Sequence, residues 1–377
     1  MKILFISRTL GFYFGGAENY EVSLAHILKK HGHEVNFLAG VPIFKKAENL
    51  NDLNDFKILR CKTLFFKNTA QKLFHFNDKM GLLFFNLDNY IFKKIILKKY
   101  KKIFTKDQYD LFQITGQIDL AHSIKKISKG KVSVFFPGIL DINKIDKILK
   151  VDGVFSDGYS YNLLKEIHPN VSIIHGGIRQ NIYFSKYERE QKRRKYLSEK
   201  NEKIILMVNR LVFLKNIKLA IDIAKILNDN RENFKLIIIG EGPDKNRLQK
   251  YITKFNLGKK VMLMGFIPPK YLFSYYSAAD IFLLTSQFDN FPNVIKEAMK
   301  IGLPIIASNN SGIKMLVKDG ENGFLCNNKN DFTNKISFLF LNPQISKKIS
   351  EKNIKKAEKL FNWETSYNKY INYINNL

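Results

Sequence analysis

Short apolar segments of strand length alternate with longer segments of helical pattern along nearly the whole chain, and this alternation constrains the fold more than any other feature. Residues 3–7 form a buried-strand pattern, residues 17–31 carry apolar side chains at helical spacing, and residues 34–39 form a second strand pattern. A strand, a helix and a strand in this order indicate a parallel sheet with helices on both faces. Loops that follow the strands of such a sheet collect at one edge, where ligands bind.

The alternation continues in the second half of the chain, after a polar segment. Predicted strands also cover residues 111–115, 131–136, 153–156 and 171–175 in the first half, and residues 204–208, 236–239, 261–264, 281–284, 304–307 and 323–325 in the second. The basic segment 185–203 is typical of a linker or of an exposed first helix of a second domain. Because 377 residues exceed one ordinary core, we predict two doubly wound, Rossmann-like α/β domains over residues 1–184 and 185–359.

The net charge of the chain indicates which kinds of partner it can bind. Lysine and arginine together number 62 against 34 aspartates and glutamates, which gives a formal net charge of +28. Such an excess favours an anionic partner: nucleic acid, an acidic membrane surface or a phosphorylated small molecule. Part of the excess is equally consistent with the codon bias of an AT-rich genome.

The sequence contains no apolar run of membrane-spanning length. The longest runs are strand-sized, far below the ~20 residues that a bilayer requires. The first residues have the pattern of a buried strand rather than of a signal peptide. Cys61 and Cys326 are the only cysteines and lack the spacing of a metal or redox pair. We therefore expect a cytoplasmic protein, with a possible peripheral site on the inner face of the cell membrane.

Residues 64–104 are rich in lysine and aromatic side chains. On a helix, one face would carry the apolar residues Phe92, Ile95, Ile96, Tyr100 and Ile103, and the opposite face would carry Lys94, Lys98 and Lys101. This pattern is typical of a helix that lies in an anionic membrane surface. The same pattern is typical of a helix whose apolar face packs on the sheet and whose lysines are solvated, so both alternatives stay open.

Two predicted loops carry groups that suit phosphate. Gly15 and Gly16 follow the first strand and open a helix, where backbone can approach a phosphate or simply form a tight turn. Arg210 and Lys215 lie on one loop after the first strand of the second domain. Two converging cations are what a diphosphate needs, although in so basic a chain they can also be solvated surface residues.

The most informative stretch runs from Ser286 to Ser308. Asp289 lies in a loop before a predicted helix that carries Glu297. The backbone amides of Asn293, Val294 and Ile295 would lie at the N-terminus of that helix, where an anion is favoured. The carboxylate of Glu297 could accept hydrogen bonds from sugar hydroxyls.

Together these motifs resemble glycosyltransferase family 4, the large retaining group with the GT-B fold of two Rossmann-like domains that face a cleft. The resemblance spans nearly the whole chain and rests on the order and spacing of several short motifs. They are Gly15-Gly16, Gly32-His33-Glu34-Val35, Arg210 with Lys215, Gly240-Glu241-Gly242-Pro243, Gly265-Phe266, Asp289 to Glu297, Asp319 to Leu325, and Phe361-Asn362-Trp363-Glu364.

The resemblance implies a role for each site residue. Arg210 and Lys215 would bind the donor diphosphate, and the backbone of Gly16 would approach it from the other domain. Asp289 would hold the hydroxyls of the donor sugar, and Glu297 the ribose of the nucleotide. Base and ribose would also contact three further residues, which are Gly240, Glu241 and Ile267. The N-terminal domain, residues 1–184, would bind the acceptor, and the C-terminal domain, residues 185–359, would bind the nucleotide-sugar donor. The final helix, at about residues 360–377, would pack back on the N-terminal domain.

The implied reaction is the transfer of a hexose-type sugar from a nucleotide-sugar donor, UDP- or GDP-linked, with no metal or other cofactor. The acceptor would be a glycan or a lipid-linked molecule in the synthesis of cell-surface polysaccharide or glycolipid. Alternatives are a nucleotide-sugar epimerase and a non-catalytic GT-B subunit. A nucleic-acid-binding protein is disfavoured because no recognised binding module is present.

The chain departs from the family pattern at three places. Asp289 stands where glutamate is usual, and Pro137 stands where many members carry histidine. The segment His175-Gly176-Gly177-Ile178-Arg179 replaces a usual Pro-Asn-Gly-Ile/Val-Asp. His122 could replace the missing imidazole, but a lone histidine is more often structural.

Overall fold

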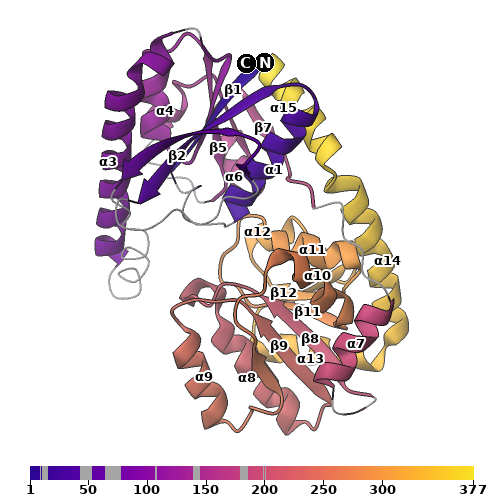
Figure 1. Ribbon diagram of the computed structural model, residues 1–377. Coiled ribbons are helices and arrows are strands. Elements are labelled where there is room, and N and C mark those ends of the chain that lie inside the picture. The colour runs from indigo at the N-terminus through magenta and orange to yellow at the C-terminus, as the bar shows by residue number, and fades with distance from the viewer. Residues whose placement is uncertain are drawn as a thin grey trace. The chain divides into compact units, whose positions relative to one another are not determined.

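The computed structural model describes residues 1–8, 10, 16–42, 53–63, 78–106, 108–138, 145–178, 186–197, 199 and 201–377. The chain divides into two compact units (Figure 1). Unit 1 contains residues 1–176 and 363–377, and unit 2 contains residues 177–362. The boundaries predicted from the sequence were 184/185 and about 359/360; residues 179–185 lie outside the described residues.

Unit 1 is built on a seven-stranded sheet in which every neighbouring pair is parallel, with the order β3-β2-β1-β4-β5-β6-β7. The strands are β1 (Lys2–Ser7), β2 (Glu34–Pro42), β3 (Lys57–Thr63), β4 (Leu111–Thr115), β5 (Lys131–Phe136), β6 (Gly153–Ser156) and β7 (Val171–Ile173). The helices are α1 (Gly16–Lys30), α3 (Asp78–Thr105), α4 (Ile118–Lys125), α5 (Ile145–Ile148), α6 (Ser160–Leu164) and α15 (Trp363–Asn375).

Alternating side chains of β1 divide the core of unit 1 into two layers. Ile3 and Phe5 pack with residues of α1 and α15 on one face, while Leu4 and Ile6 pack with residues of α3 and α4 on the other. Figure 1 shows these helix pairs on opposite faces of the sheet. Helices on both faces of a parallel sheet are the doubly wound arrangement.

Unit 2 repeats this plan with a six-stranded parallel sheet of order β10-β9-β8-β11-β12-β13. Its strands are β8 (Lys203–Val208), β9 (Phe234–Ile239), β10 (Val261–Leu263), β11 (Ile281–Leu284), β12 (Ile305–Ser308) and β13 (Gly323–Cys326). Its helices are α7 (Lys186–Tyr196), the 3₁₀ turn η3 (Phe213–Lys215), α8 (Ile217–Asp229), α9 (Lys245–Lys254), α10 (Pro269–Ala278), α11 (Asn293–Ile301), α12 (Ser311–Lys314), α13 (Lys329–Leu341) and α14 (Pro343–Leu360). The predicted α/β, doubly wound fold class is confirmed.

Helix α7 settles an alternative that the sequence left open, and strand β3 is an element that the sequence did not predict. The basic segment before β8 forms the helix α7, which is the second of the two alternatives left open. Strand β3 was not predicted. It lies at the edge of the sheet and exposes Lys57, Arg60 and Lys62. Charged side chains at a sheet edge disfavour pairing with another chain. They also interrupt the alternation of apolar residues by which a strand is predicted from sequence.

Helix α3 contains the described part of the aromatic and basic segment. Phe92 and Ile96 are fully buried in the core of unit 1, and Tyr100 packs against the same cluster. The apolar face is therefore occupied by the sheet and is not free to enter a lipid interface. Lys94 and Lys98 remain exposed, so an electrostatic contact with an anionic surface stays a prediction. Residues 64–77 lie outside the described residues.

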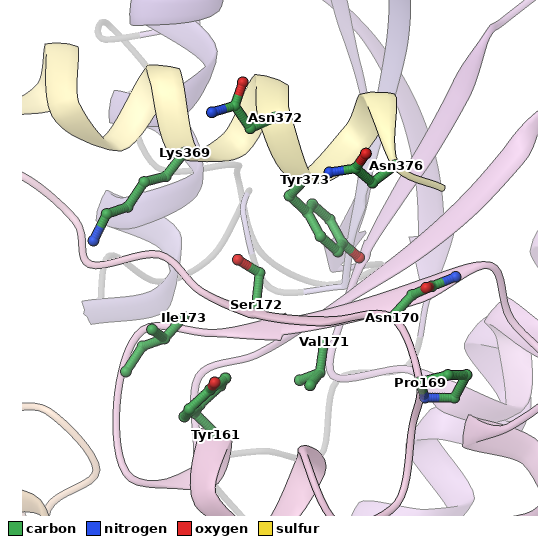
Figure 2. Close-up of a pocket in the computed structure, with 10 residues that line it drawn as sticks. All are labelled: Tyr161, Pro169, Asn170, Val171, Ser172, Ile173, Lys369, Asn372, Tyr373 and Asn376. Carbon is green, nitrogen blue, oxygen red and sulfur yellow. The ribbon is translucent and has the colours of Figure 1, made fainter.

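No helix among the described residues is long and apolar enough to cross a membrane. A cavity of about 510 Å³ lies in unit 1 between β7, α6 and α15. Figure 2 shows Asn372 and Asn376 of α15 on one side of β7, and Val171 and Ile173 pointing to the other side, toward Tyr161. None of the predicted site residues lines this cavity.

Candidate functional site

The predicted residues of unit 2 lie on loops at the carboxyl ends of its strands. The sheet order reverses between β8 and β11, and open α/β sheets bind ligands outside the strand ends at this point. The loop after β8 carries Arg210 and Lys215, and the loop after β11 carries Asp289. Fold topology therefore brings both predicted cations and the first predicted acid to the same position of the sheet.

Hydrogen bonds tie these two loops together. The backbone N–H of Gln287 donates to the Leu214 carbonyl over 2.9 Å. The hydroxyl of Thr285 donates to the carbonyls of Lys215 and Asn216, at 3.2 and 2.9 Å. Asn216 adopts the left-handed conformation with φ 46°, which ends the 3₁₀ turn and starts α8. The backbone that carries Lys215 is thus fixed from both sides.

The side chains of Lys215 and Asp289 form an ion pair between the loops. Both are largely buried, with 13% and 11% of the side chain exposed. The pair occupies Oδ1 of Asp289, whereas the buried Oδ2 has no hydrogen-bond partner among the described residues. A buried acceptor without a partner is unfavourable by about 1–3 kcal/mol. This carboxylate would therefore gain from a hydrogen-bond donor supplied by a ligand.

The loop after β9 lies directly against the loop after β8. A Cβ atom on Gly240 would stand 1.7 Å from the Asn209 carbonyl oxygen, and one on Gly242 would stand 2.2 Å from that of Leu211. Only glycine permits these contacts. The backbone N–H of Leu211 donates to the carbonyl of Glu241 over 2.9 Å, so Glu241 is held beside Arg210.

Gly265 continues this edge after β10. It has a φ of +73°, and a Cβ there would lie 2.8 Å from Oε1 of Glu241. Ile267 follows and packs against the cluster that contains Ile295 and Ala298 of α11. The structure thus gathers Gly240, Glu241 and Ile267, which the sequence places far apart from α11, along one edge of unit 2.

Helix α11 begins at Asn293, and its N-cap residue, Pro292, makes no side-chain cap hydrogen bond. The amide of Ile295 donates to the Pro292 carbonyl over 3.1 Å, so this amide is already engaged within the turn. Asn293 and Val294 are the partly exposed residues that open the helix. Of the three backbone amides predicted to bind an anion, those of Asn293 and Val294 therefore remain the candidates.

Glu297 lies on α11 and is oriented by a residue that the sequence analysis did not identify. The hydroxyl of Tyr276, a fully buried residue of α10, donates to Oε2 of Glu297 over 2.8 Å. Burial, followed by the nearby carboxylate of Glu297, raises the pKa of Tyr276 well above its usual value. Tyr276 had no sequence signal beyond an apolar position in a helix.

A second unpredicted support holds the Asp289 loop. A Cβ on Gly312 would stand 1.8 Å from the Asp289 carbonyl oxygen, and Nδ2 of Asn310 donates to the Ser286 carbonyl over 3.0 Å. The start of α12 therefore packs directly against the loop that carries Asp289. No three histidine, cysteine, aspartate or glutamate side chains cluster as a metal site in the described part of the chain.

In unit 1, Gly16 is exposed and opens α1, whereas Gly15 lies outside the described residues. Unit 1 also contains buried charged groups near the ends of β1 and β4. Arg8, directly after β1, forms an ion pair with Asp88 of α3, and both side chains are almost fully buried. Glu21 of α1 is 1% exposed, and a hydrogen bond joins its Oε1 to the hydroxyl of Thr115 at the end of β4.

A comparison with solved structures defines the class of the fold. The crystal structure of HepE from Anabaena in complex with UDP and glucose matches with a TM-score of 0.78 over 100% of both chains, at 19% sequence identity. At this identity the likeness shows the fold alone. The fold is GT-B, shared with solved glycosyltransferases.

Sequence comparisons give one family match within the second unit and several relatives that match over part of their length. Residues 188–356 match the family model of "Glycosyl transferases group 1". The amylovoran biosynthesis glycosyltransferase AmsK of Erwinia amylovora is 35% identical over 127 residues, or 32% of this chain and 31% of that protein. The alpha-monoglucosyldiacylglycerol synthase of Acholeplasma laidlawii is 29% identical over 178 residues, or 46% of this chain and 45% of that protein. The chain thus spans less than half the length of these curated relatives.

The buried carboxyl of Glu21 predicts an unusual pH dependence of stability. Burial raises its pKa from the usual 4.5 to about 8, although the bond to Thr115 acts in the opposite direction. Between these two pH values the folded protein holds a proton that the unfolded chain releases, so stability falls as pH rises. We expect Glu21→Gln to flatten this fall by on the order of a few kcal/mol.

The measurement is the free energy of unfolding in urea at several pH values from 4.5 to 8. Glu166→Gln, an exposed glutamate of the same unit, is the matched control and should keep the wild-type slope. Equal slopes for wild type and Glu21→Gln would show that Glu21 is ionised in the folded state.

Proposed function

We propose that the protein is a retaining glycosyltransferase of family 4 that moves a hexose-type sugar from a UDP- or GDP-linked donor to a glycan or lipid-linked acceptor. The observation that carries this proposal is the junction of the loops after β8 and β11, where Lys215 pairs with Asp289 on the edge that also presents Arg210. The names of the two relatives refer to amylovoran biosynthesis and to a glucosyldiacylglycerol. They support a role in cell-surface polysaccharide or glycolipid synthesis.

The proposed chemistry depends on where charge develops. As the bond from the sugar to the diphosphate breaks, negative charge grows on the diphosphate and positive charge on the sugar ring. Arg210 and Lys215 would stabilise the departing diphosphate, together with the amides of Asn293 and Val294 at the start of α11. Because these groups supply positive charge, we expect transfer without a metal ion or other cofactor.

The remaining residues would hold the donor in position. The carboxylate of Asp289 would accept hydrogen bonds from sugar hydroxyls, and the orphaned Oδ2 is the atom that gains most. Glu297, aligned by Tyr276, would accept from the ribose hydroxyls. Gly240, Glu241 and Ile267 would seat the base and the ribose, and Gly16 would approach the diphosphate with its backbone. Holding the reacting groups in this way lowers the barrier through orientation.

Incubation of the protein with UDP- and GDP-linked sugars, each with and without a lipid-linked acceptor, tests the function. We expect a glycosylated acceptor, the donor's anomeric configuration in the product by NMR, and unchanged turnover in EDTA. A changed sugar without acceptor would identify an epimerase instead. Nucleotide binding without any turnover across the set would identify a non-catalytic subunit.

The two cations give the first prediction for this site. Replacing Arg210 or Lys215 by alanine removes a charged hydrogen-bond donor from the diphosphate, so binding of UDP or GDP should weaken by ~1.5–3 kcal/mol for each variant. Isothermal titration calorimetry measures the change. Lys225→Ala removes an exposed lysine of α8 that pairs with Asp229, and it should bind like the wild type. Unchanged affinity in both site variants would overturn the assignment.

The two acids give a contrasting prediction. Asp289→Asn removes an acceptor for the donor sugar, so turnover should fall by roughly 100-fold or more, a loss typical of a transition-state contact. Its affinity for the nucleotide diphosphate should stay close to that of the wild type. Glu297→Gln should instead weaken nucleotide binding, because its proposed contact is to the ribose. Near-normal turnover of Asp289→Asn with the true donor would mean that Asp289 does not bind the sugar.

A further inference from the structure

The two edges of the unit 1 sheet differ in how they oppose pairing with another chain. Strand β3, at one edge, exposes three charged side chains. Strand β7, at the other edge, consists of Val171, Ser172 and Ile173, which are uncharged and half-buried. An edge strand without charged side chains is a template on which a further strand can pair.

The backbone of β7 presents hydrogen-bonding groups on its open side. The carbonyl of Asn170 accepts a hydrogen bond from β6 over 3.0 Å, and the N–H of Ile174 donates one to β6 over 2.9 Å. Backbone groups of successive residues in a strand point to alternate sides. Val171 and Ile173 therefore direct both their N–H and their C=O groups away from β6, where an added strand would meet them.

The cavity of about 510 Å³ runs along this open edge. The consecutive residues 169–173 line it, together with Tyr161 of α6 and one face of α15. On α15 that face carries Lys369, Asn372 and Asn376, which lie side by side because they are spaced by three and four residues. Pockets of ~300–1,000 Å³ hold a drug-sized ligand, about the size of three or four amino-acid residues. The cavity is thus large enough for a short extended segment.

The two sides of β7 differ in chemistry, as Figure 2 shows. Ser172 points toward α15, whose cavity-lining lysine and asparagines are exposed. Val171 and Ile173 point to the other side, toward Tyr161. A strand that paired with β7 would place its own side chains alternately on these two sides. The edge therefore matches a segment in which polar and apolar residues alternate.

Charge favours an acidic segment over a second copy of this chain. Lys369 is the one charged residue among the described residues that line the cavity, and it is exposed. Strand β7 contains no acidic residue that could pair with this lysine in a second copy. The chain also carries a formal net charge of +28, so two copies repel each other whereas an acidic segment is attracted.

We propose that β7 and the adjoining cavity form a docking site for an extended segment of a partner protein in which acidic and apolar residues alternate. The segment pairs as an added strand with the outward backbone groups of Val171 and Ile173. Its acidic side chains lie toward Lys369 and its apolar side chains toward Tyr161. This site is separate from the donor site proposed in unit 2, and it does not depend on the glycosyltransferase function.

Fluorescence anisotropy with the labelled peptide Glu-Val-Glu-Val-Glu-Val tests the proposal on the full chain. We expect saturable binding of this peptide. The isomer Glu-Glu-Glu-Val-Val-Val, which keeps the charge but not the alternation, should bind at least about tenfold more weakly, because added strands gain specificity from alternate side chains. Absence of saturable binding, or equal binding of the two isomers, would overturn the proposal.

Methylation of the peptide backbone tests strand pairing directly. In an added strand only every second N–H faces β7. N-methyl groups on all glutamates should therefore abolish binding while N-methyl groups on all valines leave it intact, or the reverse. Equal effects of the two methylation patterns would show that the peptide does not bind as a strand, and the proposal would be wrong.

Two pairs of variants locate the binding site. Val171→Pro removes an outward N–H without removing a bond to β6, and proline is tolerated at the first residue of an edge strand. It should weaken peptide binding about tenfold or more, whereas Val171→Ala, which keeps the N–H, should bind nearly like the wild type. Lys369→Glu should weaken binding about tenfold, because like charges would then face each other. Lys126→Glu, at an exposed lysine after α4 of the same unit, is its control.

Thermal unfolding of each variant checks that the fold is retained. Should Val171→Pro fail to fold, Lys369→Glu still decides the location, since its side chain is exposed. Peptide binding that neither Lys369→Glu nor a folded Val171→Pro weakens would place the peptide elsewhere and overturn the proposal. Sedimentation equilibrium tests the other occupant: a dimer of the wild type that Val171→Pro dissociates would identify a second copy on this edge, and the proposed partner would be wrong.

Discussion

Backbone contacts that only glycine allows set the geometry of the candidate site in unit 2. The loops after β8 and β9 touch at Gly240 and Gly242, and the loop after β11 touches the start of α12 at Gly312. In each case an added Cβ would fall within 2.2 Å of a carbonyl oxygen, a distance that no side chain can relieve by rotating. The site is therefore fixed by main chain packed on main chain, and its side chains are displayed from a rigid edge.

On this edge, the ion pair of Lys215 with Asp289 compensates two largely buried charges. A nearly buried carboxylate without a partner would be unfavourable, because a charge removed from water and left uncompensated destabilises the fold by several kcal/mol. The ion pair neutralises Asp289 while Lys215 remains on the loop that carries Arg210. In the proposed site Lys215 would bind the diphosphate while Asp289 beside it binds the sugar, so one ion pair links the groups that would hold the two halves of a nucleotide-sugar donor.

The two units share a topology but use it differently. Each sheet reverses its order at one point, between β1 and β4 in unit 1 and between β8 and β11 in unit 2. The carboxyl edge of unit 2 presents Arg210 and Lys215, whereas that of unit 1 has a cavity lined by the carboxamides of Asn86, Asn89 and Gln117 together with charged residues, Lys93 and Asp119.

The sequence alone determined the α/β class, most strands and the order of the motifs, because period-two and helical patterns are local properties of the chain. It placed Arg210, Lys215, Asp289 and Glu297 on loops after strands or on the following helix, since strand ends are readable from a few residues. Strand β3 was not predicted, because an edge strand with exposed lysines lacks the apolar alternation of a buried strand. The sequence also could not decide between a membrane face and a core face for α3, since both use the same amphipathic pattern, and burial of Phe92 and Ile96 decided it.

Only the tertiary structure paired Lys215 with Asp289, set Tyr276 against Glu297, and placed Gln117 opposite Asn89. These partners are 74, 21 and 28 residues apart in the chain. Contacts of this kind depend on which strands become neighbours in the sheet, and no local pattern in the sequence specifies that.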